Sequence, residues 1–137
     1  MKKVFLIAKI AIILLICFLS PSIYAYDEER AITNLASDFA QCSAFYIISA
    51  EGLRKTGDER LATKFMETSK TAYDYAVKFS NQRVTEARIK LAVDEQTKEI
   101  DHNYSNLSIL ILQYGEICKE ALESPERRLQ YWLTKKD

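Results

Sequence analysis

The stretch Ile100–Leu122, IDHNYSNLSILILQYGEICKEAL, decides the fold that this sequence predicts. Its apolar residues recur in alternating steps of four and three, which is typical of one buried seam along an α-helix. The seam consists of Ile100, Tyr104, Leu107, Ile111, Tyr114, Cys118 and Ala121. Other apolar residues surround Ile111 on nearly every side. We therefore expect this helix at the centre of a bundle, covered by its neighbours.

Two earlier segments show the same helical spacing. The first helix is predicted over residues 27–55, with a seam of Ile32, Leu35, Phe39, Cys42, Tyr46, Ser49 and Leu53. A row of small residues beside that seam favours close approach of a neighbouring helix: Ala36, Ala40, Ser43, Ala44 and Ala50. Gly57 as a left-handed cap and Asp58 as an N-cap then predict a sharp boundary. A second helix is expected over residues 59–79, and Asn81 is the best N-cap for a third that starts near Arg83.

The third helix could run straight from residue 83 to residue 122, a length of about 60 Å. The cysteines argue against this. Cys42 would lie roughly 20 Å up the bundle and Cys118 roughly 55 Å up, whereas bonded cysteines have Cα atoms within about 7 Å. A reversal over residues 102–107 brings them to within about 10 Å in height. Polar residues that compete for backbone hydrogen bonds mark this segment: Asn103, Ser105, Asn106 and Ser108.

The predicted fold is therefore all-α: a small antiparallel bundle of four main helices plus a short C-terminal amphipathic helix. The alternative has three helices, the third very long, and its apolar half would have to be covered by a second chain. Ser124 and Pro125 start the last helix as N-cap and first helical residue. Leu129, Trp132 and Leu133 share one of its faces and are expected to cover an open end of the bundle. Its basic residues are placed on the other side: Arg127, Arg128, Lys135 and Lys136.

Residues 1–25 resemble a cleaved signal peptide. A basic segment with Lys2, Lys3 and Lys9 is followed by an apolar run over residues 10–19. This run is too short to span a bilayer, which takes about 20 residues in a helix. Cleavage is expected after Ala25, which leaves residues 26–137 as a single helical domain in the periplasm or outside the cell. Cys17 has the outline of a lipid-attachment site, but the residue before it, Ile16, is not small.

Cleavage would leave sixteen Lys and Arg against nineteen Asp and Glu, a net charge of −3. No basic stripe remains that would bind nucleic acid, and no stable membrane span is expected after processing. Two cysteines survive, Cys42 and Cys118. An even number in an oxidising compartment favours a disulfide between them, and two buried free thiols are the alternative.

Catalytic, metal-binding and cofactor-binding chemistry is not expected. Glu99 and His102 have the Glu-x-x-His spacing of di-iron bundles, but those need a second motif, and His102 is the one histidine in the sequence. No glycine-rich phosphate loop or nucleophile elbow occurs. The leading hypothesis is an exported binding protein, such as an inhibitor, an immunity-type protein or an adaptor, whose partner is another envelope or secreted protein. The alternative is a carrier of a small apolar ligand in the bundle core, suggested by Tyr46, Tyr75, Tyr104 and Tyr114.

Overall fold

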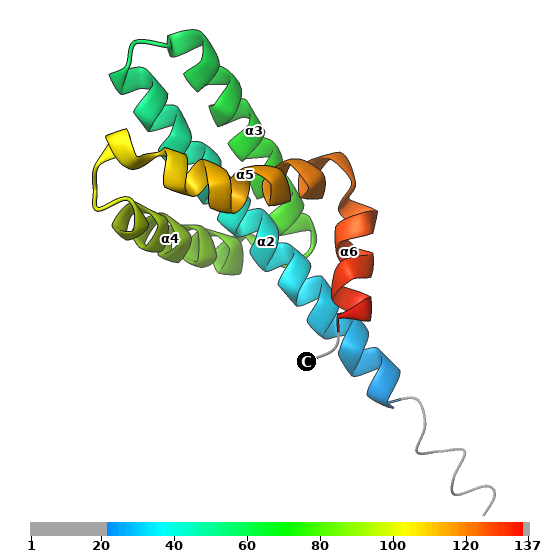
Figure 1. Cartoon of the computed structure of the whole chain (residues 1–137). Coiled ribbons are helices and arrows are strands. Elements are labelled where there is room, and N and C mark those ends of the chain that lie inside the picture. Colours follow the sequence, from blue (N-terminus) through cyan, green and yellow to red (C-terminus); the bar gives the residue numbers. More distant parts are fainter. Residues whose placement is uncertain (1–21, 136–137) are drawn as a thin grey trace, which may run out of the picture. The chain divides into compact units, whose positions relative to one another are not determined.

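The computed structural model describes residues 22–135, and within this range the chain is helical without a strand. The α-helices are α2 (Ser22–Lys55), α3 (Glu59–Lys78), α4 (Gln82–Glu99), α5 (Ser108–Glu123) and α6 (Pro125–Thr134), with a 3₁₀ turn η1 (Tyr104–Asn106) before α5 (Figure 1). The part from Ala31 onward forms one compact unit, separate from the part up to Arg30. The predicted all-α fold is confirmed, and a small helical bundle fits this compact unit.

Within the compact unit, α2 is the helix that its neighbours cover. Its buried residues include large ones such as Phe39, Phe45 and Ile48, and small ones such as Ala36 and Ala44. The small side chains let other helices approach α2 from several sides. The expectation that the helix around Ile111 is central was wrong, because Ile111 on α5 is 52% exposed and its neighbour Leu112 is 87% exposed.

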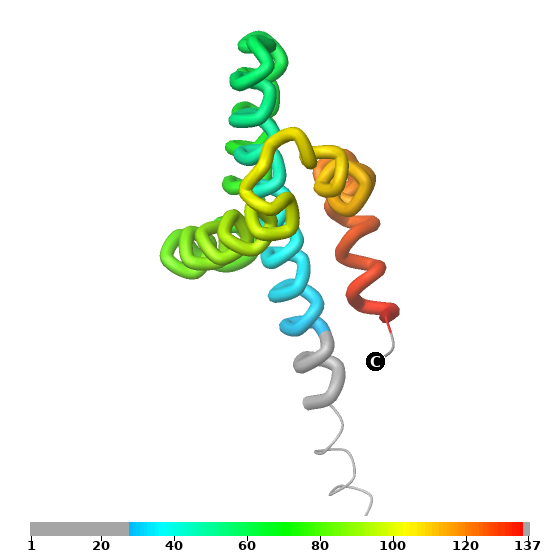
Figure 2. The backbone as a smooth tube through the Cα atoms, turned by 60° about the vertical axis from the view of Figure 1, so that its left-hand side comes forward, coloured from blue at the N-terminus to red at the C-terminus, as the bar shows by residue number. Residues whose placement is uncertain are grey.

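α3 runs alongside α2, whereas α4 and α5 cross it (Figures 1 and 2). Two ring pairs show that α2 and α3 are antiparallel: Phe39–Tyr75 and Tyr46–Phe65, with centroids 4.9 and 5.5 Å apart. From the first pair to the second, the residue number rises along α2 and falls along α3. Two apolar clusters fill the unit. One surrounds Cys42 and Cys118, and the other packs α6 against α2 through Trp132, a partly buried residue, as predicted for a helix that covers one end.

Two helices end in the same hydrogen-bonded motif. At the end of α2, Asp58 N donates to Leu53 O and Gly57 N donates to Arg54 O, with Gly57 at φ +86°. This is a Schellman cap, in which a left-handed residue satisfies the last carbonyl groups. α4 ends in the same way, since His102 N donates to Thr97 O and Asp101 N to Lys98 O. Here an aspartate occupies the glycine position, at φ 53°.

The predicted reversal over residues 102–107 is confirmed, and the straight third helix is wrong. α4 stops at Glu99, and Asp101 and His102 both adopt left-handed backbone angles. Asn103 Oδ1 then accepts a hydrogen bond from Ser105 N and caps η1, as its local bonding preference suggested. The N-caps Asp58 and Asn81 are confirmed too, through bonds from Leu61 N and Val84 N.

The reversal also explains why the seam predicted across it is only partly buried. Ile100, Cys118 and Ala121 are buried, but Leu110 takes the core position expected for Ile111. A seam keeps its phase only while the helix is continuous. The left-handed residues and η1 reset the rotation, so positions counted from Ile100 no longer describe the inward face of α5.

The first described helix starts earlier than the sequence predicted, since α2 begins at Ser22 rather than at Asp27. The predicted signal peptide lies almost entirely outside the described residues. In the described part of the chain, none of the helices combines the length and apolar character that a membrane span requires.

Two glycine substitutions should have opposite effects on stability. Gly57→Ala should lower the free energy of unfolding by about 1 kcal/mol, because alanine resists the left-handed backbone there. An added Cβ would meet no atom within 4 Å, so a steric clash cannot be the cause. Gly115→Ala, inside α5, should raise the free energy of unfolding by about 0.5–1 kcal/mol, because alanine favours a helix. Urea unfolding of both variants measures the two signs, and destabilisation by both would contradict this account.

Candidate functional site

The structure brings Cys42 on α2 and Cys118 on α5 together in disulfide geometry, with Cα atoms 5.3 Å apart. Both side chains are almost completely buried. They lie in the cluster that contains Ile100 and Leu110, so the pair ties the reversed part of the chain to the central helix. A disulfide shielded from solvent in this way is a structural link rather than a reactive redox centre.

The residues considered for metal binding point outward. Glu99 and His102 are both exposed, and Glu99 Oε1 accepts a hydrogen bond of 2.9 Å from the Tyr114 hydroxyl. Among the described residues, no group of three or more His, Cys, Asp or Glu side chains could hold a metal ion.

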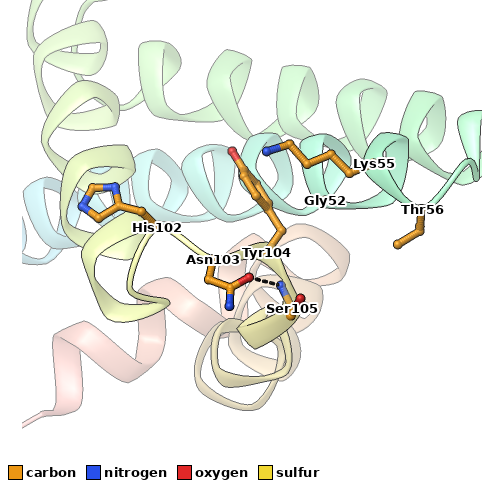
Figure 3. A pocket seen from close by; sticks show the side chains of 7 residues that line it. All are labelled: Gly52, Lys55, Thr56, His102, Asn103, Tyr104 and Ser105. Atoms are coloured by element: carbon orange, nitrogen blue, oxygen red, sulfur yellow. Dashed lines mark hydrogen bonds between the residues drawn. The ribbon is translucent and has the colours of Figure 1, made fainter.

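A polar hollow of about 390 Å³ lies where the reversal meets the end of α2 (Figure 3). The Lys55 ammonium sits 3.9 Å from the centre of the Tyr104 ring, and the Tyr104 hydroxyl donates to Glu51 Oε2 at 2.5 Å. The His102 ring is turned away from this pair (Figure 3). Tyr104 therefore joins the turn to α2 through Lys55 and Glu51, and the described residues that line the hollow do not pair a nucleophile with a base.

At Gly52, which lines the hollow, the turn lies close to the backbone of α2. A Cβ on Gly52 would lie 3.1 Å from Leu107 Cδ2 and 3.2 Å from Tyr104 Cδ1. Glycine thus allows the turn to pack directly on α2.

A second feature joins α6 to α2 by charge. Asp38 Oδ2 accepts hydrogen bonds of 2.6 Å from both Arg128 Nε and Trp132 Nε1. The Asp38 and Arg128 side chains are only 12% and 14% exposed. The prediction that Arg128 lies on the outer, basic face of the last helix was therefore wrong. Breaking such a pair leaves an uncompensated buried charge, which is strongly destabilising.

The most prominent feature on the surface is an apolar stretch of α5. Ile109, Ile111 and Leu112 are 43%, 52% and 87% exposed and lie within one turn of the helix; we call them the α5 ridge. Exposed apolar side chains scattered singly are ordinary, whereas a contiguous group marks an interaction surface. The ridge is our candidate functional site.

The fold belongs to the all-α class, and comparison with known proteins adds no relative. No protein-family model, no curated protein and no solved structure matches the chain.

Sequence reasoning missed the Asp38 pairing and the exposure of the ridge. Asp38 lies next to Phe39 in an apolar helix, and an acid in that setting calls for a buried partner. Arg128 and Trp132 are four residues apart and so share one helix face. Those two donors were a usable signal. The ridge had none, because its exposure depends on the phase of α5 after the reversal.

The cysteine pair gives a test by non-additivity. Cys118→Ser should lower the free energy of unfolding by roughly 2–4 kcal/mol, and Cys42→Ser by a similar amount. The double variant should lose no more than either single variant, because both remove the same bond. Urea unfolding of all three variants measures this, and reduction of the wild-type protein should match them. Additive losses, or no two-proton mass difference on reduction, would exclude the disulfide.

The hydrogen bonds of Tyr104 and Tyr114 to carboxylates predict an alkaline transition. The hydrogen bond to Glu51 raises the pKa of Tyr104 to about 12, whereas burial first, and then the bond to Glu99, raises the pKa of Tyr114 to about 12. An unfolded tyrosine has a pKa of about 10. Because the two tyrosines hold their protons to higher pH in the folded state, their contacts stabilise that state. This contribution to the free energy of unfolding is complete below about pH 10 and is lost between about pH 10 and 12.

Spectrophotometric titration of the phenolates can separate the two causes. Glu51→Gln should lower the pKa of Tyr104 more than Glu99→Gln lowers that of Tyr114, because burial still acts on Tyr114. Tyr104→Phe should remove one late-titrating group. If all tyrosines of the wild-type protein ionise together near pH 10, the contacts do not exist in solution.

Proposed function

We propose that this protein is an exported binding protein that contacts another envelope or secreted protein through the α5 ridge, as an inhibitor, an immunity-type protein or an adaptor. The observation that supports this is the exposure of Leu112, at 87%, together with that of Ile109 and Ile111 in the same turn of α5. Burying one such side chain yields about 1.5–3 kcal/mol. A single exposed leucine would be ordinary, but three exposed aliphatic residues within one turn of α5 offer a partner a shared apolar surface.

The setting of the ridge favours protein recognition. α5 is held to α2 through Cys118, so its exposed face is fixed before a partner arrives, which lowers the entropic cost of binding. Exposed polar residues follow the ridge, among them Gln113, Glu116 and Lys119. An apolar centre with a polar edge is the usual composition of a protein interface.

A carrier of a small ligand in the bundle core receives less support. Tyr104 and Tyr114 are bound to Glu51 and Glu99. Tyr46 and Tyr75 pack on phenylalanine rings. These tyrosines, which suggested the carrier, are thus occupied by contacts within the chain. We propose no catalytic activity and no cofactor.

The ridge can be tested with Leu112→Glu and a matched control, Leu91→Glu. Leu91 is also an exposed leucine, at 63%, but lies on α4. Leu112→Glu should reduce recovery of the partner at least about tenfold, since one buried leucine contributes about 1.5–3 kcal/mol. Leu91→Glu should leave recovery unchanged. The measurement is the amount of partner that co-purifies with each tagged protein from its native host.

Both variants should unfold within about 0.5 kcal/mol of the wild type, because each replaces a surface side chain. Equal recovery with Leu112→Glu and wild type would exclude the ridge as the interface. If light scattering shows that the purified protein is a dimer and that Leu112→Glu makes it a monomer, the ridge binds a second copy and the proposal of a different partner fails.

A further inference from the structure

An apolar groove of about 380 Å³ opens between α2, α3 and α4, away from the α5 ridge. Helix α3 follows α2, whereas α4 crosses it, so that α3 and α4 diverge after the loop that joins them (Figures 1 and 2). The groove is lined by Ser43 and Ile47 of α2, by Met66, Ser69, Lys70 and Tyr73 of α3, and by Glu86, Ile89 and Lys90 of α4. We call it the α3–α4 groove.

The floor of the groove needs no polar ligand. The Ser69 hydroxyl donates to the Ser43 carbonyl at 3.0 Å, and the two hydroxyl oxygens are 3.0 Å apart, so the Ser43 hydroxyl can donate to Ser69. Both serines are buried and have hydrogen-bond partners. The walls are formed by Ile47, Met66 and Ile89, which offer apolar surface. A chain of methylene groups therefore fits this floor better than a polar molecule does.

The charged side chains on the rim of the groove differ in their hydrogen bonds and ion pairs. Lys70 Nζ is 2.8 Å from Asp74 Oδ2. Glu86 Oε1 accepts hydrogen bonds from Gln82 Nε2 at 2.8 Å and from the Tyr73 hydroxyl at 3.4 Å. Within the described part of the chain, no hydrogen bond or ion pair involves the Lys90 ammonium, which is exposed. The neutral donors hold the Glu86 carboxylate without cancelling its charge, so Lys90 is, among the described residues of the lining, the one charged side chain without a hydrogen bond or ion pair.

We propose that the α3–α4 groove binds a single-chain amphiphile with an anionic head group, such as a fatty acid. The chain lies against Ile47, Met66 and Ile89, and the head group pairs with Lys90. Small-molecule sites occupy about 300–1,000 Å³, so this groove suits one chain rather than a two-chain lipid. Met66 adapts to an irregular chain, because its unbranched side chain is flexible and polarisable. This proposal is independent of partner binding through the α5 ridge.

Met66 gives a direct way to test the groove. The sequence holds two methionines, and the other is Met1, in the predicted signal peptide. The mature protein labelled with ¹³C at the methionine methyl group should therefore show one resonance, from a groove residue. Titration with laurate, below the concentration at which it forms micelles, should shift this resonance to saturation. Fluorescence of Trp132, on α6, should stay unchanged.

The head group is tested with probes of the same chain length. Dodecyl maltoside, which is neutral, should bind roughly two- to fivefold more weakly than laurate, as expected for the loss of one exposed ion pair. Dodecyltrimethylammonium, which is cationic, should bind about tenfold more weakly. Lys90→Glu should weaken laurate about tenfold and leave dodecyl maltoside unaffected.

Lys64→Glu is the matched control, because it makes the same charge change at an exposed position of α3 outside the groove lining. It should leave laurate affinity unchanged. The proposal is overturned if laurate does not shift the Met66 resonance, if the three probes bind equally, or if both lysine variants act alike. A Met66 shift caused by a partner protein but not by laurate would also overturn it, since the groove would then be a protein interface.

Discussion

Cys42 and Cys118 meet inside the apolar cluster that contains Ile100 and Leu110, and much of the remaining structure depends on this contact. The two residues are 76 positions apart in sequence. For Cys118 to reach the central helix, the chain must reverse between α4 and α5. The reversal requires left-handed backbone at Asp101 and His102, a conformation that costs non-glycine residues roughly 1–2 kcal/mol each. Burial of the surrounding cluster offsets this cost.

The reversal also determines which side of α5 faces water. α5 is apolar around most of its circumference, and packing covers only the side of Leu110, Cys118 and Ala121. The α5 ridge is what remains outside. The apolar character that suggested a central helix thus belongs to a peripheral helix with an exposed apolar surface, while α2 occupies the centre.

The outer helices are attached to α2 in different ways. α6 is held by the pairing of Arg128 and Trp132 with Asp38. α4 buries polar residues against α2: Gln96 Nε2 donates to the Gln41 carbonyl at 3.0 Å, while Gln96 Oε1 and Thr85 Oγ1 are buried without a partner in the structure. Unsatisfied buried polar atoms weaken a contact. α4 thus joins α2 partly through polar side chains, and the α3–α4 groove opens beside it.

Local chemistry in the sequence determined the helices, their caps at Asp58 and Asn81, the glycine boundary and the reversal, because each depends on residues within a few positions of one another. The cysteine pair could be predicted from the even number of cysteines after cleavage, and the pair in turn argued against the straight helix. The sequence did not reveal that Asp101 takes the glycine position of a second Schellman cap, because aspartate adopts that backbone only when the surrounding packing enforces it. The exposed side of α5 and the α3–α4 groove were decided by the tertiary structure alone, and for the partner of Asp38 the sequence offered a signal in Arg128 and Trp132 but not the pairing itself. All three depend on how helices that are distant in sequence are rotated and crossed, and the phase of α5 is set by a turn that interrupts the helical repeat.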